Sequence, residues 1–389
     1  MPNIQMERGV FCSYANRLAG AARERKTRGE FATFMPDDGA SGFAHGPPSM
    51  QPAPASVRNW LIVVAAMILF MIAIGALTRL TESGLSMVEW RPVTGWLPPL
   101  SDAAWNAELE KYLSSPQGRT TNRGFNVVEF REIFWLEYSH RLWGRLIGVA
   151  FAVPLAWFWW RGQLTPHLKP RLLALLLLGG LQGALGWAMV ASGLVDRPAV
   201  SHYRLAAHLL LAVVLYAYTV WLILELGPQA ARRDDAETSR MATALIGFLF
   251  VVLTWGALMA GLRAGTAHAT FPTMSGHWIP PGLFDLAPWW INPFENGTTI
   301  QFIHRWLAKL LVLGVLILAW RVRRPETLAA GAMALLQLGL GIATILSGIN
   351  IFLATAHQVG AVLLLTSLIV IRHRATPSQQ RPVSAMVGG

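Results

Sequence analysis

The feature that most constrains the fold of this chain is a series of eight apolar stretches, each close to the length that crosses a bilayer. A transmembrane helix needs about 20 largely apolar residues, and 53% of this 389-residue sequence is hydrophobic while 14% is charged. The first stretch begins at Trp60, too far along the chain and too long for a signal peptide. We therefore predict an all-α integral membrane protein with spans at 60–78, 142–160, 172–194, 205–224, 241–262, 306–320 (beginning nearer Thr299), 328–347 and 351–371.

The net charge of +11 is better explained by membrane topology than by nucleic-acid binding. Lys and Arg gather in alternate connections and in the C-terminal tail, and cytoplasmic loops carry such an excess. We expect both termini in the cytoplasm and the protein in the inner (plasma) membrane of a bacterium. The mitochondrial inner membrane is the weaker alternative, because Glu7, Glu24 and Glu30 are unusual in a transit peptide. The basic residues on the expected inner side are Arg161, Lys169, Arg171, Arg232, Arg233, Arg240, Arg321, Arg323, Arg324, Arg372, Arg374 and Arg381.

The segments outside the spans differ in character. Residues 1–57 and 373–389 are predicted to be disordered cytoplasmic tails, because they lack a helical apolar period. The long outside loop 81–139 is expected to contain a short interfacial helix near 103–112. The only cysteine, Cys12, lies in the first tail, so neither an intramolecular disulfide nor a cysteine-based metal site can form.

The spans divide into two related sets of four, which predicts an N-terminal half at 58–226 and a C-terminal half at 241–372. Four spans per half preserve direction, so the two tandem four-helix bundles should be related by a pseudo-two-fold axis along the membrane normal. The residues that repeat are Gly75 with Gly256, His140-Arg141 with His304-Arg305, Gln182 with Gln337, Gly186 with Gly341, and Ala207-His208 with Ala356-His357.

Four of the ten histidines, His140, His208, His304 and His357, occupy duplicated positions in the spans. The predicted topology places all four near the outer leaflet, two in each half. Histidine is a usual axial ligand of haem iron, and helical bundles hold cofactors between facing helices. A single intramembrane histidine could equally be a hydrogen-bonded structural group, but the duplicated pattern favours two bis-histidine haem sites.

Glu137 lies three residues before His140, on the same helical face if the helix extends that far. The second half has Gln301 at the matching place. This difference suggests that Glu137 exchanges protons or orients a substrate in the N-terminal half alone, although a solvated interfacial glutamate is the simpler alternative. Arg141 and Arg305 could contact haem propionates, or could instead extend to the membrane interface.

Together these residues resemble the haem A synthase family, over about residues 58–372. The resemblance implies an oxidoreductase that converts the C8 methyl of haem O to the formyl of haem A by successive oxidations, with oxygen from either dioxygen or water. It implies a haem b cofactor on His304 and His357, substrate haem on His140 and His208, and a functional Glu137. Some members of the family carry a cysteine pair in each outside loop, and this chain has none. In this respect it resembles the cysteine-free branch typical of proteobacteria and mitochondria.

The resemblance also implies partners, namely a haem O synthase, assembly factors of a terminal oxidase and an electron donor, and the chain could form a homo-oligomer. Two rival functions are a dihaem b-type protein that oxidises quinol and a transporter built on tandem repeats. The quinol-oxidising protein would hold two haems b. The transporter would hold no tight haem and would bind its ligand near the membrane midplane.

Overall fold

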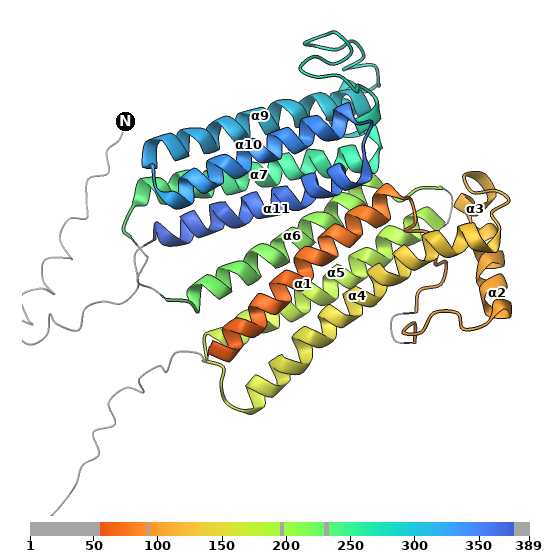
Figure 1. Ribbon diagram of the computed structural model, residues 1–389, viewed down its shortest axis with the longest axis horizontal. Coiled ribbons are helices and arrows are strands. Elements are labelled where there is room, and N and C mark those ends of the chain that lie inside the picture. Colours follow the sequence, from red (N-terminus) through yellow and green to blue (C-terminus); the bar gives the residue numbers. More distant parts are fainter. Residues whose placement is uncertain (1–54, 92–93, 195–197, 229–232, 377–389) are drawn as a thin grey trace, which may run out of the picture. The chain divides into compact units, whose positions relative to one another are not determined.

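The computed structural model describes residues 55–91, 94–194, 198–228 and 233–376, and these ranges contain eight long apolar helices. The predicted all-α architecture with eight candidate membrane spans is confirmed (Figure 1). The spans are α1 (Ala55–Leu80), α4 (Val127–Trp160), α5 (Leu168–Leu194), α6 (His202–Glu225), α7 (Ala236–Gly261), α9 (Gly297–Val322), α10 (Pro325–Leu346) and α11 (Ile351–Arg374).

The predicted tails are slightly too long. Residues 55–57 form the first turn of α1, and residues 373–374 form the end of α11. Both short segments extend an apolar helix past the end of its continuous hydrophobic run, which a hydropathy pattern cannot show. The rest of both predicted tails, apart from residues 375 and 376, lies outside the described residues, as does Cys12.

Helix α4 begins far earlier than the predicted span at 142–160, inside the predicted loop 81–139. Asn126 caps it by accepting hydrogen bonds from the Val128 and Glu129 amides, while the Glu129 carboxylate accepts from the Asn126 amide. Such a reciprocal capping box fixes a helix start. The first turns of α4 mix polar and aromatic residues, so they were not recognised as part of an apolar span, but they place Glu137 and His140 on one continuous helix.

The segment between α1 and α4 folds onto the start of α4. Its helix α2 (Asp102–Leu113) confirms the short helix expected near 103–112, and a second helix, α3 (Pro116–Thr120), follows. Trp105 and Tyr112 from α2 pack with Phe130, Phe134 and Tyr138 from α4 in a buried aromatic cluster. This packing anchors the outside segment to α4.

The segment between α7 and α9 is held by asparagine side chains. Asn292, in the short helix α8 (Asn292–Glu295), donates to the Leu286 and Trp289 carbonyls at 2.8 Å each. Asn296 caps α9 by accepting from the Thr298 and Thr299 amides. The sixth span therefore begins at Gly297, close to the Thr299 expected from the sequence.

We call α1, α4, α5 and α6 the N-terminal set and α7, α9, α10 and α11 the C-terminal set. The sets meet where α6 packs on α7 and where α11 packs on α1 and α6 (Figure 1). Gln358 on α11 also donates to the Ile72 carbonyl of α1 at 3.1 Å. The larger hydrophobic cluster combines residues of α1, α6, α7, α9, α10 and α11, and a second cluster lies within the N-terminal set.

Candidate functional site

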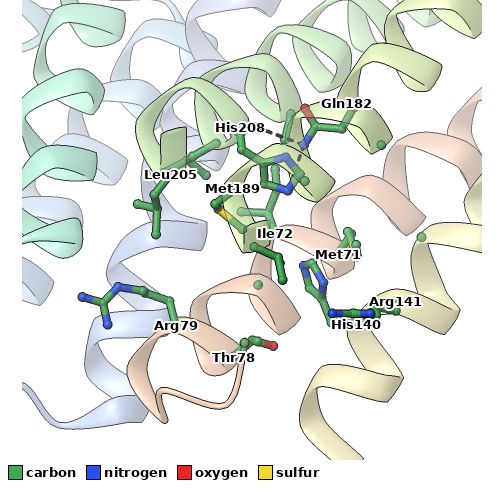
Figure 2. A pocket seen from close by; sticks show the side chains of 18 of the residues that line it. Met71, Ile72, Thr78, Arg79, His140, Arg141, Gln182, Met189, Leu205 and His208 are labelled. Atoms are coloured by element: carbon green, nitrogen blue, oxygen red, sulfur yellow. Dashed lines mark hydrogen bonds between the residues drawn. The ribbon is translucent and has the colours of Figure 1, made fainter. Parts of the chain in front are cut away.

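The N-terminal set forms most of the wall of a partly open cavity of about 610 Å³, and both of its duplicated histidines line this space. Figure 2 shows His140 on α4 and His208 on α6 directed into the same pocket, beside Met71 and Ile72 of α1 and Met189 of α5. The two imidazoles are near enough to interact electrostatically. The structure therefore brings together the two histidines that the repeat pattern paired.

The position of His208 is fixed by α5. The Gln182 amide donates to the main-chain carbonyl of His208 at 3.0 Å (Figure 2). Gly186, one turn later on α5, lies against the ring, and a Cβ at this position would be 3.1 Å from His208 Cε1. The buried Nδ1 of His208 has no hydrogen-bond partner among the described residues. A fixed imidazole with a buried, unpartnered nitrogen fits a site that is completed by a ligand.

The C-terminal set repeats this arrangement around His357. The Gln337 amide of α10 donates to the His357 carbonyl of α11 at 2.7 Å and lies 3.1 Å from His357 Nδ1. Gly341 lies against the imidazole, since a Cβ there would be 2.8 Å from His357 Cε1. Gln337 and Gly341 thus make the same kind of contact as their sequence counterparts on α5.

The second histidine of this set, His304 on α9, is oriented by α7. Its Nδ1 lies 3.1 Å from the Val252 carbonyl. A Nδ1–H donated to that carbonyl leaves Nε2 with a lone pair, the arrangement that iron-binding histidines commonly show. His304 and His357 are near enough to interact electrostatically. His304 and His357 are therefore the residues of this set that could hold a haem iron.

Glu137 is buried at the wall of the cavity and is 2% exposed. Its carboxylate accepts hydrogen bonds from the Ser86 hydroxyl at 2.7 Å and the Met87 amide at 2.8 Å, and it pairs with Arg141 one turn later. The alternative of a solvated interfacial glutamate is therefore wrong. Burial costs a carboxylate its hydration, and three donors here replace the lost water.

Arg141 lines the same cavity, but much of its guanidinium is already used. It donates to the Met87 and Glu89 carbonyls at 2.8 and 2.9 Å, and it lies over the ring of Trp90 at 5.1 Å. Glu137 and Arg141 therefore hold the segment that follows α1 against α4.

The matching pair in the C-terminal set is Gln301 and Arg305. Both side chains hold their outside segment by donating hydrogen bonds to its main-chain carbonyls. The Gln301 amide donates to the Gly265 and His268 carbonyls at 3.2 and 3.0 Å. Arg305 donates to the Thr270 carbonyl at 2.8 Å and also to the His268 carbonyl. The exchange of glutamate for glutamine thus accompanies a change from an acceptor to a donor.

Two arginines at the outer end of the cavity were not singled out from the sequence. Arg79, at the end of α1, lines the cavity and donates to the Gly261 carbonyl of α7 at 3.1 Å. Arg263 lines it as well and pairs with Glu82 at 2.6 Å. Both lie at the junction of the two sets, where a sequence pattern confined to one half gives no signal.

The remaining described transmembrane histidines have other contacts. His202 begins α6 and is buried, 3.5 Å from Glu295. Its ring packs on Tyr203 at a centroid distance of 4.0 Å. His373 is buried near the end of α11, edge-on to Trp221. Neither lines the cavity that contains His140 and His208.

This fold and these sites define a multi-pass membrane protein with two pairs of facing intramembrane histidines. Residues 58–369 match the family described as "Cytochrome oxidase assembly protein". The chain belongs to this family.

The curated relatives carry a more specific name. "Heme A synthase" of Rhodospirillum centenum is 48% identical over 351 residues, which cover 86% of this chain and 94% of that protein. "Heme A synthase" of Bradyrhizobium diazoefficiens is 48% identical over 83% of this chain and 92% of its own length. "Heme A synthase" of Nitrosospira multiformis is 44% identical, with 82% and 92% covered.

Proposed function

We propose that this chain is a haem A synthase, a membrane oxidoreductase that converts the C8 methyl of haem O to a formyl group. The observation that carries the proposal is the cavity of the N-terminal set, which presents His140, His208 and the buried Glu137 to one space large enough for a ligand bulkier than a metal ion. The names of relatives that match nearly their whole length support the same reaction.

The two histidine pairs would have different tasks. His140 and His208 would bind substrate haem, since they face an open cavity. His304 and His357 would hold a resident haem b, which when bound relays electrons. Gln182 and Gln337 would then fix the orientation of one imidazole in each pair, as outer partners of metal-bound histidines do.

Glu137 would act on the substrate from the cavity wall. Its carboxylate could take up a proton released during oxidation if one of its three donors moved away, or it could hold Met87 and Ser86 in place beside the substrate edge. Arg141 in the N-terminal set and Arg305 in the C-terminal set would lie near haem propionates. Both guanidinium groups already donate to main-chain carbonyls. They would therefore attract the propionates through their positive charge rather than through additional hydrogen bonds.

The remaining expectations follow the same proposal. Both termini would lie in the cytoplasm, in the inner membrane of a bacterium, and the two four-helix sets would be related by a pseudo-two-fold axis. A haem O synthase would supply the substrate, and factors that assemble a terminal oxidase would receive the product. The chain could act as a homo-oligomer.

The proposal is tested in a strain that makes haem O but has no haem A synthase of its own. Expression of the chain should produce haem A, identified by chromatography of extracted haems. The variant His140→Ala, expressed at the same level, should leave haem O unconverted. Unconverted haem O with the wild-type chain, when haem b is bound and the electron donor is present, would overturn the proposal.

A further inference from the structure

The cavity of the N-terminal set continues far below its histidines. On α4 its lining runs from His140 to Phe151, and on α6 it runs from His208 to Thr219. Each of these stretches covers twelve residues, whose ends lie about 16 Å apart along the helix. The lining of α1, from Gly75 back to Val64, covers the same length. The space therefore has a deep arm that starts at the level of the imidazoles and runs along the helices.

The deep arm is apolar and lacks side chains on one side. Its walls are made by Val64, Ile68, Phe151, Leu175, Leu176 and Leu215. Glycines of α4 and α5 also line it, and Gly148, Gly179 and Gly183 are exposed, with nothing within 4 Å of an added Cβ. Such an arm would take a flexible hydrocarbon chain and would reject a charged group.

The C-terminal set fills the corresponding space. The counterpart of Gly179 by the sequence repeat is Ala334. Gly179 is exposed beside open space, whereas Ala334 is fully buried in the main hydrophobic cluster. The same contrast appears in whole helices, since 6% of the most apolar window of α5 is buried, against 33% for that of α10. The arm is thus a property of the set that contains Glu137.

We propose that the deep arm binds the isoprenoid chain of haem O, with the porphyrin held above it at the level of His140 and His208. The proposal rests on the proposed function, because haem O carries a hydroxyethylfarnesyl chain where protohaem carries a vinyl group. The occupied arm would select the chain-bearing haem for the N-terminal site. The filled C-terminal set would leave room only for a haem without that chain.

The first test compares two probes on the wild-type protein, purified with haem b already in its C-terminal site. Haem O and protohaem are titrated into the N-terminal site and followed by absorbance. We expect haem O to bind at least about tenfold more tightly. Equal affinities would overturn the proposal, and because this test needs no variant, it does not depend on how a mutant folds.

The second test fills the arm with Gly179→Leu and Gly183→Leu. The matched control is Gly339→Leu, since Gly339 is an exposed mid-helix glycine on α10 that also has nothing within 4 Å of an added Cβ. The arm variants should lose about tenfold in affinity for haem O while keeping wild-type affinity for protohaem and a normal spectrum of the C-terminal haem. The control should retain the haem O affinity of the wild type.

Three other results would count against the proposal. Unchanged haem O binding in both arm variants would show that the chain lies elsewhere, and equal weakening of both haems would show a general distortion of the site. A lipid acyl chain in the arm would appear as co-purified lipid that haem O does not displace, and it would also contradict the proposal. If wild-type protein prefers haem O but forms no haem A, the proposed function fails while the binding site stands.

Discussion

Arg141 pairs with the carboxylate of Glu137 one turn earlier on α4, and only 7% and 3% of these two side chains are exposed. The same pair holds the Met87 main chain from both sides, since Glu137 accepts from its amide and Arg141 donates to its carbonyl. A buried pair that loses one member leaves an uncompensated charge, which is strongly destabilising. Glu137 thus fixes an outside segment to the wall of the cavity.

Replacing Glu137 should separate product formation from cofactor binding. We expect Glu137→Ala to lower haem A production about 100-fold or more, because proton handling at a reacting centre contributes at least that much. The C-terminal haem should stay in place, because Glu137 forms its hydrogen bonds and its ion pair with Ser86, Met87 and Arg141 of the N-terminal half. Extracted haems and the absorption spectrum of the purified variant check both expectations.

The matched control for this variant is Glu132→Ala, which removes an exposed carboxylate from the same helix. It should produce haem A at the wild-type level. Wild-type output from Glu137→Ala would show that the reaction does not need this carboxylate. A loss of the C-terminal haem in the same variant would mean that the two sets are coupled more tightly than their contacts indicate.

The four histidines should divide into two independent pairs. His304→Ala and His357→Ala should each remove the stable haem b, whereas His140→Ala and His208→Ala should leave it and abolish retention of haem O. Absorption spectra of the reduced proteins report the first loss, and chromatography of extracted haems reports the second. The exposed His167 provides a control, because His167→Ala should lose neither haem. Normal low-spin spectra in both His304→Ala and His357→Ala would refute the assignment.

Gln337 should support His357 without being essential. Gln337→Leu removes the donor to the His357 carbonyl but keeps the volume of the side chain. We expect about a tenfold weaker affinity for haem b, the lower end of the effect typical of outer partners of metal ligands, and no loss of folding. The measurement is the rate at which apomyoglobin removes haem b from the purified protein. A rate equal to that of the wild type would limit Gln337 to helix packing.

The outside segment over the C-terminal set should loosen in acid. Burial, the nearby charge of Arg305 and then that of His277 lower the pKa of His268. A histidine in an opened segment titrates near 6.5, so the opened form binds the proton first as pH falls. The stabilising contribution of this residue is therefore present above about pH 6.5 and is lost progressively below it.

This pH effect can be measured as the rate of limited proteolysis between residues 268 and 292. Cleavage should be faster at pH 5.5 than at pH 7.5. His268→Phe should remove most of this difference while keeping the main-chain hydrogen bonds from Gln301 and Arg305, which use the His268 carbonyl. An identical pH dependence in the variant would assign the effect to another group.

The sequence predicted the helices and the pairing of the histidines because both depend on periodic, local signals. His140 and His208 occupy matching depths in the second and fourth spans, so their meeting at one cavity followed from topology alone. The start of α4 was predicted wrongly, since the turns that carry Phe130 and Phe134 are held by packing on α2, which a hydropathy window does not measure.

Two other features lay beyond the sequence pattern. Two of the three partners of Glu137, Ser86 and Met87, lie in irregular backbone, for which no periodicity exists. The deep arm depends on the separation of α4 and α5. In the sequence, the glycines of α5 are equally typical of a surface where two helices pack closely. Only the placement of Gly179 and Gly183 beside open space distinguishes these two meanings.

The most direct measurement is the haem content of the detergent-purified wild-type protein after co-expression with a haem O synthase. A pyridine haemochrome spectrum and chromatography of the extracted haems identify what is bound. We expect haem b together with haem O, a hydroxylated intermediate or haem A. Haem b alone would contradict the synthase function in favour of electron transfer, and the absence of any haem would contradict both histidine sites.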